Sequence, residues 1–259
     1  MLYLISPAKS FAHKQPAVKI SDSRPQFADD SVHLVSHLQK LSAADLEKLM
    51  KISPKLAALN AQRFAQFSAD FTPKNSHPAL FAFDGDVYKS MTVQSYGEDD
   101  LNFANDHLRI LSGLYGVLKP LDLMQEYRLE MGTKTGKILG QTLYAFWQEK
   151  ISQYLNEELK NQSWQGQEEK TLINLASEEY FGAVNTQKIN AKIINIIFKE
   201  KKGDGYKIIG IHAKRARGLM ADFAIKNKIT KAADLQDFDL GNYRFNDEMS
   251  DGLDWVFCR

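Results

Sequence analysis

Short apolar runs typical of strands alternate with helical stripes along the whole of this 259-residue chain. The first strand-like run is Leu2–Ile5 and the last is Leu253–Phe257. The longest stripe runs from Thr142 to Leu159, with apolar residues every three or four positions, which is the period of an amphipathic helix. A chain that interleaves these two patterns folds with helices packed around a sheet.

Other segments follow the same two patterns. Helices are expected over residues 31–41, 42–50, a segment beginning at Pro54, 101–111 and 213–228. Strands are expected over residues 80–83, 171–175, 193–198 and 206–212. Ser42 and Pro54 support two of the helix starts, because serine caps a helix and proline fits its first turn.

A hairpin is embedded in the C-terminal third of the chain. The segment 201–205, Lys-Lys-Gly-Asp-Gly, separates two expected strands, and Asp-Gly favours a tight hairpin. We therefore expect a mixed α/β (α+β-like) fold, with a mixed sheet wrapped by helices, Leu2–Ile5 inside the sheet and Leu253–Phe257 at its edge. No repeat or Pro- or Gly/Ser-rich linker divides the chain, which predicts a single compact domain spanning residues 1–259.

The charge of the chain is nearly balanced but unevenly distributed. Its formal net charge is +1, so no overall field attracts nucleic acid. Residues 188–228, however, hold 11 basic and three acidic residues, net +8, whereas residues 27–187 carry net −6 and residues 229–259 net −4. Any basic surface must therefore be local.

Cysteine usage and hydropathy indicate a cytoplasmic protein. Cys258 is the only cysteine, so no intramolecular disulfide forms, as expected in a reducing compartment. The apolar run at the N-terminus has no preceding basic residue and is too short for a secretory signal. No run approaches the ~20 apolar residues of a membrane helix. We expect no membrane association and a monomer.

The segment Ile211–Gly218 places three cations where an expected strand leads into an expected helix. Free N–H groups at a helix start attract anions, and ligands bind beyond the carboxyl ends of strands. Lys214 and Arg217, three positions apart, point the same way, whereas Arg215 points elsewhere. This pattern predicts an anion site; the alternative is a solvated helix start.

The segment Leu111–Pro120 contains two glycines after an expected helix. Gly113 and Gly116 allow a tight turn, an arrangement typical of a helix-hairpin-helix, whose N–H groups hold a nucleic-acid phosphate. The basic residues close in sequence are Arg109, Lys119 and Arg128. The alternative, which spacing alone favours, is a glycine-capped corner packed by Leu114 and Tyr115.

Asp84 and Asp86 flank a glycine at an expected turn, and two carboxylates could hold a metal ion. An Asp-Gly turn needs no metal and no further ligands follow, so we predict no metal site and no cofactor. Asn174 at a strand end could contact a ligand, and Ser177 is typical of a helix cap. No nucleophile elbow, P-loop, zinc or dinucleotide-binding motif is present in the sequence.

The same segments resemble the YaaA family of bacterial proteins associated with resistance to peroxide stress. The similarity is carried, in order, by Leu4–Lys9, Gly85–Tyr88, Leu111–Met124, Tyr127–Met131, Asn174–Ser177 with Glu179–Tyr180, and Ala213–Lys214 with Ala216–Met220. The resemblance implies a cytoplasmic protein with an unusual α/β fold, a basic cleft with a helix-hairpin-helix-like element, and binding to double-stranded DNA. It implies no particular catalytic reaction.

We therefore expect a protein that binds double-stranded DNA, mainly through phosphates, and contributes to resistance to peroxide stress. The residues expected to contact DNA are Lys9, Lys89, Arg109, Gly113, Tyr115, Gly116, Lys119, Arg128, Asn174, Lys214, Arg215 and Arg217. The alternative is an enzyme acting on a nucleotide or nucleic acid in the same cleft. That enzyme would need a closed pocket lined by Lys9, Asp86, Tyr88, Asn174, Glu179 and Lys214.

Overall fold

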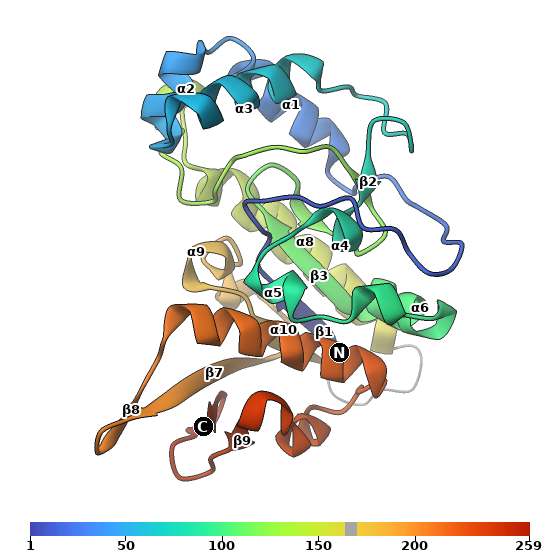
Figure 1. Cartoon of the computed structure of the whole chain (residues 1–259), viewed down its shortest axis with the longest axis vertical. Helices are drawn as coiled ribbons and strands as arrows, with labels where there is room; N and C mark the ends of the chain where they lie inside the picture. Colours follow the sequence, from blue (N-terminus) through green and yellow to red (C-terminus); the bar gives the residue numbers. More distant parts are fainter. Residues whose placement is uncertain (164–169) are drawn as a thin grey trace.

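The computed structural model describes residues 1–163 and 170–259 (Figure 1). Its main sheet has the strand order β4-β3-β1-β6-β7-β10-β9, with β8 paired to β7. These strands are β1 (Leu2–Ile5), β3 (Leu108–Ser112), β4 (Gly116–Leu118), β6 (Thr171–Leu175), β7 (Lys192–Lys202), β8 (Gly205–Lys207), β9 (Arg244–Phe245) and β10 (Asp254–Cys258). The five strands from β3 to β10 along this order are parallel, and β4, β8 and β9 are antiparallel to their neighbours. The mixed α/β fold expected from the sequence is confirmed.

Strand β1 lies inside the sheet because its four residues are all apolar and all buried. Parallel strands that are covered on both faces have continuous apolar runs of this kind. Tyr3 is opposite Leu108 of β3 on one side and Ile173 of β6 on the other. The Tyr3 hydroxyl donates a hydrogen bond to the carbonyl of Ile229 at 2.8 Å, which satisfies the only polar group of this strand's side chains.

The direction in which the chain winds along the sheet reverses between β1 and β6. From β1 the chain continues to β3 on one side, whereas from β6 it continues to β7 on the opposite side. Neighbouring parallel strands whose connections leave in opposite directions define a topological switch point, and ligands bind in the crevice outside their carboxyl ends. In this protein that crevice lies beyond Ile5 and Leu175.

Helices cover the sheet and form a further layer at one end of the molecule (Figure 1). The longer ones are α1 (Ala28–Leu38), α2 (Ala43–Met50), α3 (Pro54–Gln66), α6 (Glu98–His107), α8 (Leu143–Ser163) and α10 (Gly210–Lys226). The short ones are α4 (Ala79–Ala82), α5 (Asp86–Lys89), α7 (Gly136–Leu139) and α9 (Glu178–Phe181), with 3-10 turns η1 (Val93–Ser95), η2 (Thr186–Lys188), η3 (Ala232–Asp237) and η4 (Leu240–Asn242). Strands β2 (His77–Pro78) and β5 (Leu123–Met124) form a separate small sheet. Within the described residues, no helix is long and apolar enough to cross a membrane.

Local chemistry sets the helix starts that the sequence predicted. Ser42 and Asp45 form a reciprocal capping box at the start of α2. Ser53 accepts a backbone hydrogen bond at the start of α3, and Pro54 is the first helical residue. The long helix expected over 142–159 is confirmed as α8.

Two predictions for the middle of the chain are wrong. Residues 80–83, expected as a strand, belong largely to helix α4, where the nitrogen of Phe83 donates to the carbonyl of Ala79 at 3.1 Å. A short apolar run does not distinguish a buried strand from a buried helical turn. The helix expected over 101–111 is divided, because α6 ends at His107 and the following buried residues pair with β1 as β3. Pairing inside the sheet outweighs their helical spacing.

The C-terminal third agrees with the sequence more closely. The expected hairpin is confirmed, with Lys202 opposite Gly205, but β8 ends at Lys207 and α10 begins at Gly210, so the strand expected over 206–212 is too long. The final strand was expected at an edge. It lies between β7 and β9 instead, because residues 244–245 pair with it as the outer strand.

The segment expected to resemble a helix-hairpin-helix is a β-hairpin made of β3 and β4. Ser112 pairs with Gly116 across the turn, and Ser112 Oγ accepts a hydrogen bond from the Tyr115 nitrogen at 2.9 Å. A Cβ on Gly113 would lie 2.2 Å from the carbonyl oxygen of Leu129, so this glycine permits a close backbone approach rather than an exposed turn. The turn is buried, and its N–H groups do not face a surface ligand.

Candidate functional site

Two serines meet at the switch point, one beyond the end of each strand. Ser6 follows β1, and Ser177 lies two residues after β6. The backbone nitrogen of Ser177 donates to Ser6 Oγ at 2.9 Å, and the two hydroxyl oxygens are 3.2 Å apart. The carboxyl ends of β1 and β6 therefore carry a pair of hydroxyl groups at the position where α/β proteins bind ligands.

Helices α5 and α10 lie close to these strand ends. The hydroxyl of Tyr88, a buried residue of α5, donates to the carbonyl of Ser6 at 3.0 Å. Helix α10 packs so closely on α5 that a Cβ on Gly218 would lie 2.0 Å from the carbonyl oxygen of Val87. The contact fixes the position of α10, and with it the side chain of the neighbouring Arg217.

Arg217 is a half-buried cation whose Nε atom is buried and has no hydrogen-bond partner within the described part of the chain. Burial lowers the pKa of its guanidinium group, an effect that the charge of Glu178 opposes. Glu178 is the first residue of α9 and follows Ser177 directly, so Arg217 lies near the serine pair. Glu178 is within electrostatic range, but it forms no ion pair with Arg217 at 4 Å or less.

Three buried tyrosines lie around the same strand ends. Tyr127 and Ser112, the last residue of β3, share a hydrogen bond of 2.6 Å between their hydroxyl oxygens. Burial raises the pKa values of Tyr88, Tyr127 and Tyr180, so all three phenols stay protonated at neutral pH. They can donate or accept hydrogen bonds, but they are not poised as bases.

A narrow cleft beside these tyrosines contains two of the cations expected to bind phosphate. Lys9 Nζ lies 2.7 Å from Glu130 Oε2, and an Arg128 Nη atom lies 2.9 Å from the other oxygen of the same carboxylate. Tyr127 and Tyr180 also line this cleft. Arg128 Nε is buried without a hydrogen-bond partner among the described residues.

A larger hollow of about 460 Å³ adjoins this cleft, and Glu130 lines both. We call it the lysine hollow, because four exposed lysines line it: Lys48, Lys51, Lys134 and Lys137. No ion pair at 4 Å or less reaches any of these four ammonium groups from the residues that the structure describes. The acidic residues of the hollow are already engaged, since Glu130 pairs with two cations and Glu179 accepts a hydrogen bond from the Gly132 nitrogen at 3.1 Å.

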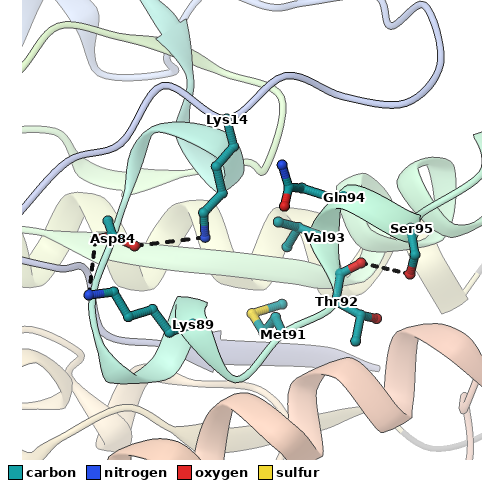
Figure 2. Close-up of a pocket in the computed structure, with 8 residues that line it drawn as sticks. All are labelled: Lys14, Asp84, Lys89, Met91, Thr92, Val93, Gln94 and Ser95. Carbon is teal, nitrogen blue, oxygen red and sulfur yellow. Dashed lines mark hydrogen bonds and ion pairs between the residues drawn. The ribbon is translucent and has the colours of Figure 1, made fainter.

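A third hollow, of about 330 Å³, surrounds Asp84 (Figure 2). The Asp84 carboxylate lies 3.2 Å from Lys89 Nζ and 3.8 Å from Lys14 Nζ, so two ammonium groups neutralise it. Asp86 pairs instead with Arg215 at 3.3 Å. The two carboxylates do not act together, and no cluster of three possible metal ligands occurs in residues 1–163 and 170–259.

The chain matches the family described as peroxide stress protein YaaA over residues 1–249. The chain belongs to this family. It is 51% identical over 259 residues to the UPF0246 protein AM1_4276 of Acaryochloris marina, and the match covers 100% of both chains. It is 48% identical over the same length to a UPF0246 protein of Saccharophagus degradans, which covers 100% of this chain and 99% of the relative.

Four of the residues expected to contact DNA are buried in this YaaA-family protein: Arg109, Gly113, Tyr115 and Gly116. Arg109 is 1% exposed and pairs with Glu158, which also attracts Lys119 at 3.4 Å. Tyr115 accepts a hydrogen bond from the Gln125 nitrogen at 2.9 Å. The Arg109 and Tyr115 side chains stabilise the fold around the β3–β4 hairpin, and all four residues are buried there.

The other residues expected to contact DNA are nearer the surface but do not form one cluster. Asn174 donates to the side chain of Asn195, 3.0 Å away, within the sheet. Lys214 is exposed at the start of α10, as is Arg215. Lys9 and Arg128 share the narrow cleft, while Lys89 lines the hollow of Figure 2.

The lysine hollow was missed by sequence reasoning. Lys48 and Lys51 come from the end of α2, whereas Lys134 and Lys137 come from the segment after Met131. Neither pair belongs to the basic stretch 188–228 or to a block of the family resemblance. No local signal joins the two pairs, since only the tertiary fold brings them to one hollow.

Proposed function

We propose that this YaaA-family protein binds double-stranded DNA through the phosphate backbone, and that this binding contributes to resistance to peroxide stress. The observation that carries the proposal is the lysine hollow, in which four lysines have no ion pair among the described residues and the carboxylates are already engaged. Uncompensated surface cations of this kind release counterions from DNA on binding, which drives association at low salt.

A second group of cations supports the same surface. Lys201, Lys202, Lys207 and Lys214 are exposed on the β7–β8 hairpin and the start of α10, and the described residues offer none of them an ion pair. In Figure 1 the hairpin, the start of α10, α9 and α2 follow one another from bottom to top along the left side of the molecule. A duplex laid along this side would pass the elements that carry both groups of lysines.

The enzyme alternative has less support from the geometry. Of its six residues, Lys9 and Glu179 line adjoining hollows, but Asn174 is bonded inside the sheet and Asp86 pairs with Arg215. Tyr88 is buried against Ser6. Three of the six side chains are thus engaged by other groups of the described protein, whereas an enzyme acting on a nucleotide would need all six on one closed pocket.

Binding is tested by titrating a fluorescent duplex at several salt concentrations. We expect affinity to fall steeply with salt, and the double variant Lys134→Gln/Lys137→Gln to lower the slope by about two while leaving the melting temperature unchanged. Lys231→Gln is the matched control, because Lys231 is exposed in the acidic C-terminal segment and belongs to neither lysine group. Affinity that stays constant between low and physiological salt would contradict the proposal.

The physiological part of the proposal needs a cellular test. A strain without the gene should be more sensitive to peroxide and accumulate more DNA damage, and the wild-type gene should reverse both effects. The Lys134→Gln/Lys137→Gln gene should reverse them less well. Full rescue by a variant with weakened DNA binding would separate peroxide resistance from DNA.

A further inference from the structure

Arg217 carries a charge that the described protein does not neutralise. Its Nε atom is buried without a hydrogen-bond partner, and no carboxylate of the described residues lies within 4 Å of its guanidinium nitrogens. Buried polar groups are normally hydrogen-bonded and buried charges are normally paired, because desolvation without compensation is costly. An unpaired arginine at this depth indicates a partner outside the chain.

The position of Arg217 identifies where such a partner would lie. Gly218 fixes α10 against α5, and Tyr88 of α5 is hydrogen-bonded to the residue that ends β1. The charge of Glu178, directly after Ser177, raises the pKa of Arg217 against the effect of burial. Arg217 therefore lies close to the start of α9, which follows β6 at the switch point where open α/β sheets bind ligands.

A second arginine lies near the same short helix. Arg128 acts on the charge state of Tyr180, two residues after Glu178, and its Nε atom is also buried without a partner in the described chain. Its side chain is 17% exposed. One Nη atom of Arg128 is engaged by Glu130, and the Ser6 hydroxyl donates to Ser177, so among the described residues the donors left unused include the Nε groups of the two arginines and the Ser177 hydroxyl. Donors of this kind suit an oxyanion.

We propose that Arg217 binds a small oxyanion, the phosphate or carboxylate group of a metabolite-sized ligand, beside Ser6 and Ser177. A guanidinium group presents paired N–H donors that match either oxyanion, which a lysine does not. A small ligand is favoured, because Arg217 is half-buried whereas Lys214 and Arg215 on the same helix are exposed. This site is independent of DNA binding and would remain if the DNA proposal failed.

The test is thermal unfolding and calorimetry of the full-length protein with inorganic phosphate, with sodium chloride at equal ionic strength as the reference. The melting temperature of the wild-type protein should rise with phosphate, because a ligand that binds the native state stabilises it by mass action. Arg217→Leu should lose the phosphate response without melting lower than wild type in its absence. Arg217→Lys should weaken phosphate binding by about tenfold, because lysine keeps the positive charge but lacks the paired N–H donors of the guanidinium group.

The controls separate the possible outcomes. Lys214→Gln should keep the phosphate response and weaken duplex binding. Arg217→Leu should lose the phosphate response and leave duplex binding unchanged. Adenosine monophosphate and acetate then distinguish a phosphate ligand from a carboxylate ligand. The proposal is overturned if wild-type protein shows no phosphate response beyond that of sodium chloride. It is also overturned if Arg217→Leu and Glu178→Gln both lower the melting temperature, since that result would identify an internal ion pair.

Discussion

Gly218 and Val87 are in direct backbone contact, so that a Cβ on the glycine would lie 2.0 Å from the valine carbonyl oxygen. Gly218→Ala must therefore push α10 away from α5. We expect it to lower the free energy of unfolding by about 2–3 kcal/mol, the usual effect of inserting a methyl group where there is no space. Chemical denaturation of the purified variant measures this loss.

Gly210→Ala is the matched control in the same helix. Gly210 is the first residue of α10, and a Cβ there meets nothing within 4 Å. This change should be neutral or stabilise the protein by a few tenths of a kcal/mol, because alanine has the higher helix propensity. Equal destabilisation by both alanines would show that the contact with Val87 is not the cause.

Arg109 should affect stability rather than binding. It is buried, pairs with Glu158, and donates to the carbonyls of Leu108 at 2.6 Å and Asn105 at 2.8 Å. Arg109→Met should lower the free energy of unfolding by about 3 kcal/mol, because Glu158 and two backbone carbonyls lose their buried donor and Lys119 replaces it only in part. Duplex affinity of the folded fraction should not change, which salt-titrated binding at low temperature checks.

Lys119→Met serves as the comparison for this pair. Lys119 reaches the same carboxylate at 3.4 Å but is 34% exposed, and exposed pairs contribute about 1 kcal/mol or less. A stable Arg109→Met protein with weakened DNA binding would show that Arg109 contacts DNA and would refute its structural role.

The sequence predicted the parts of the fold that depend on local pattern. The apolar run of β1, the caps of α2 and α3 and the hairpin near Gly203 each follow from a few adjacent residues. The helix expected over 101–111 failed at Leu108, because pairing with β1 is a contact between distant segments. The hairpin of β3 and β4 was misjudged for the same reason, since two glycines and cations fit an exposed phosphate loop as well as a buried strand turn.

Asp122 should make stability depend on pH in the weakly acidic range. Burial raises the pKa of its carboxyl group from 3.8 to about 6, although hydrogen bonds from Ser23 and the Lys119 nitrogen oppose the shift. A carboxyl group whose folded pKa is raised contributes stability that is present below pH 4 and is lost as the pH rises to 6. The loss over this window should be about 2–3 kcal/mol.

The comparison with Asp122→Asn isolates this effect, because the amide retains an acceptor oxygen and does not ionise. The wild-type protein should lose stability relative to the variant between pH 4 and pH 6, and the difference should stay constant above pH 7. Parallel stability curves across the whole range would show that Asp122 does not titrate with a raised pKa.

The candidate site was only partly predictable, and α10 shows why. The strand-to-helix transition near Gly210 and the cations that follow it were visible in the sequence. Which cation is recessed was not, because that depends on the approach of Gly218 to Val87 across 131 positions of the chain. The four lysines of the lysine hollow were invisible for the same reason.

The neighbouring cations Lys214 and Arg215 at the start of α10 differ in how far the protein neutralises their charges. Lys214 is exposed and has no ion pair among the described residues, whereas Arg215 pairs with Asp86 at 3.3 Å. Lys214→Gln should therefore weaken duplex binding about equally for different sequences and lower the salt slope by about one, as the loss of one phosphate contact does. Arg215→Gln should change the slope less, because Asp86 already neutralises part of its charge. The double variant Arg215→Gln/Asp86→Asn removes both members of the pair and should match the wild-type slope to within about half a unit. If Arg215→Gln reduces the slope more than Lys214→Gln, the duplex lies on the α5 side of the helix rather than along the lysines.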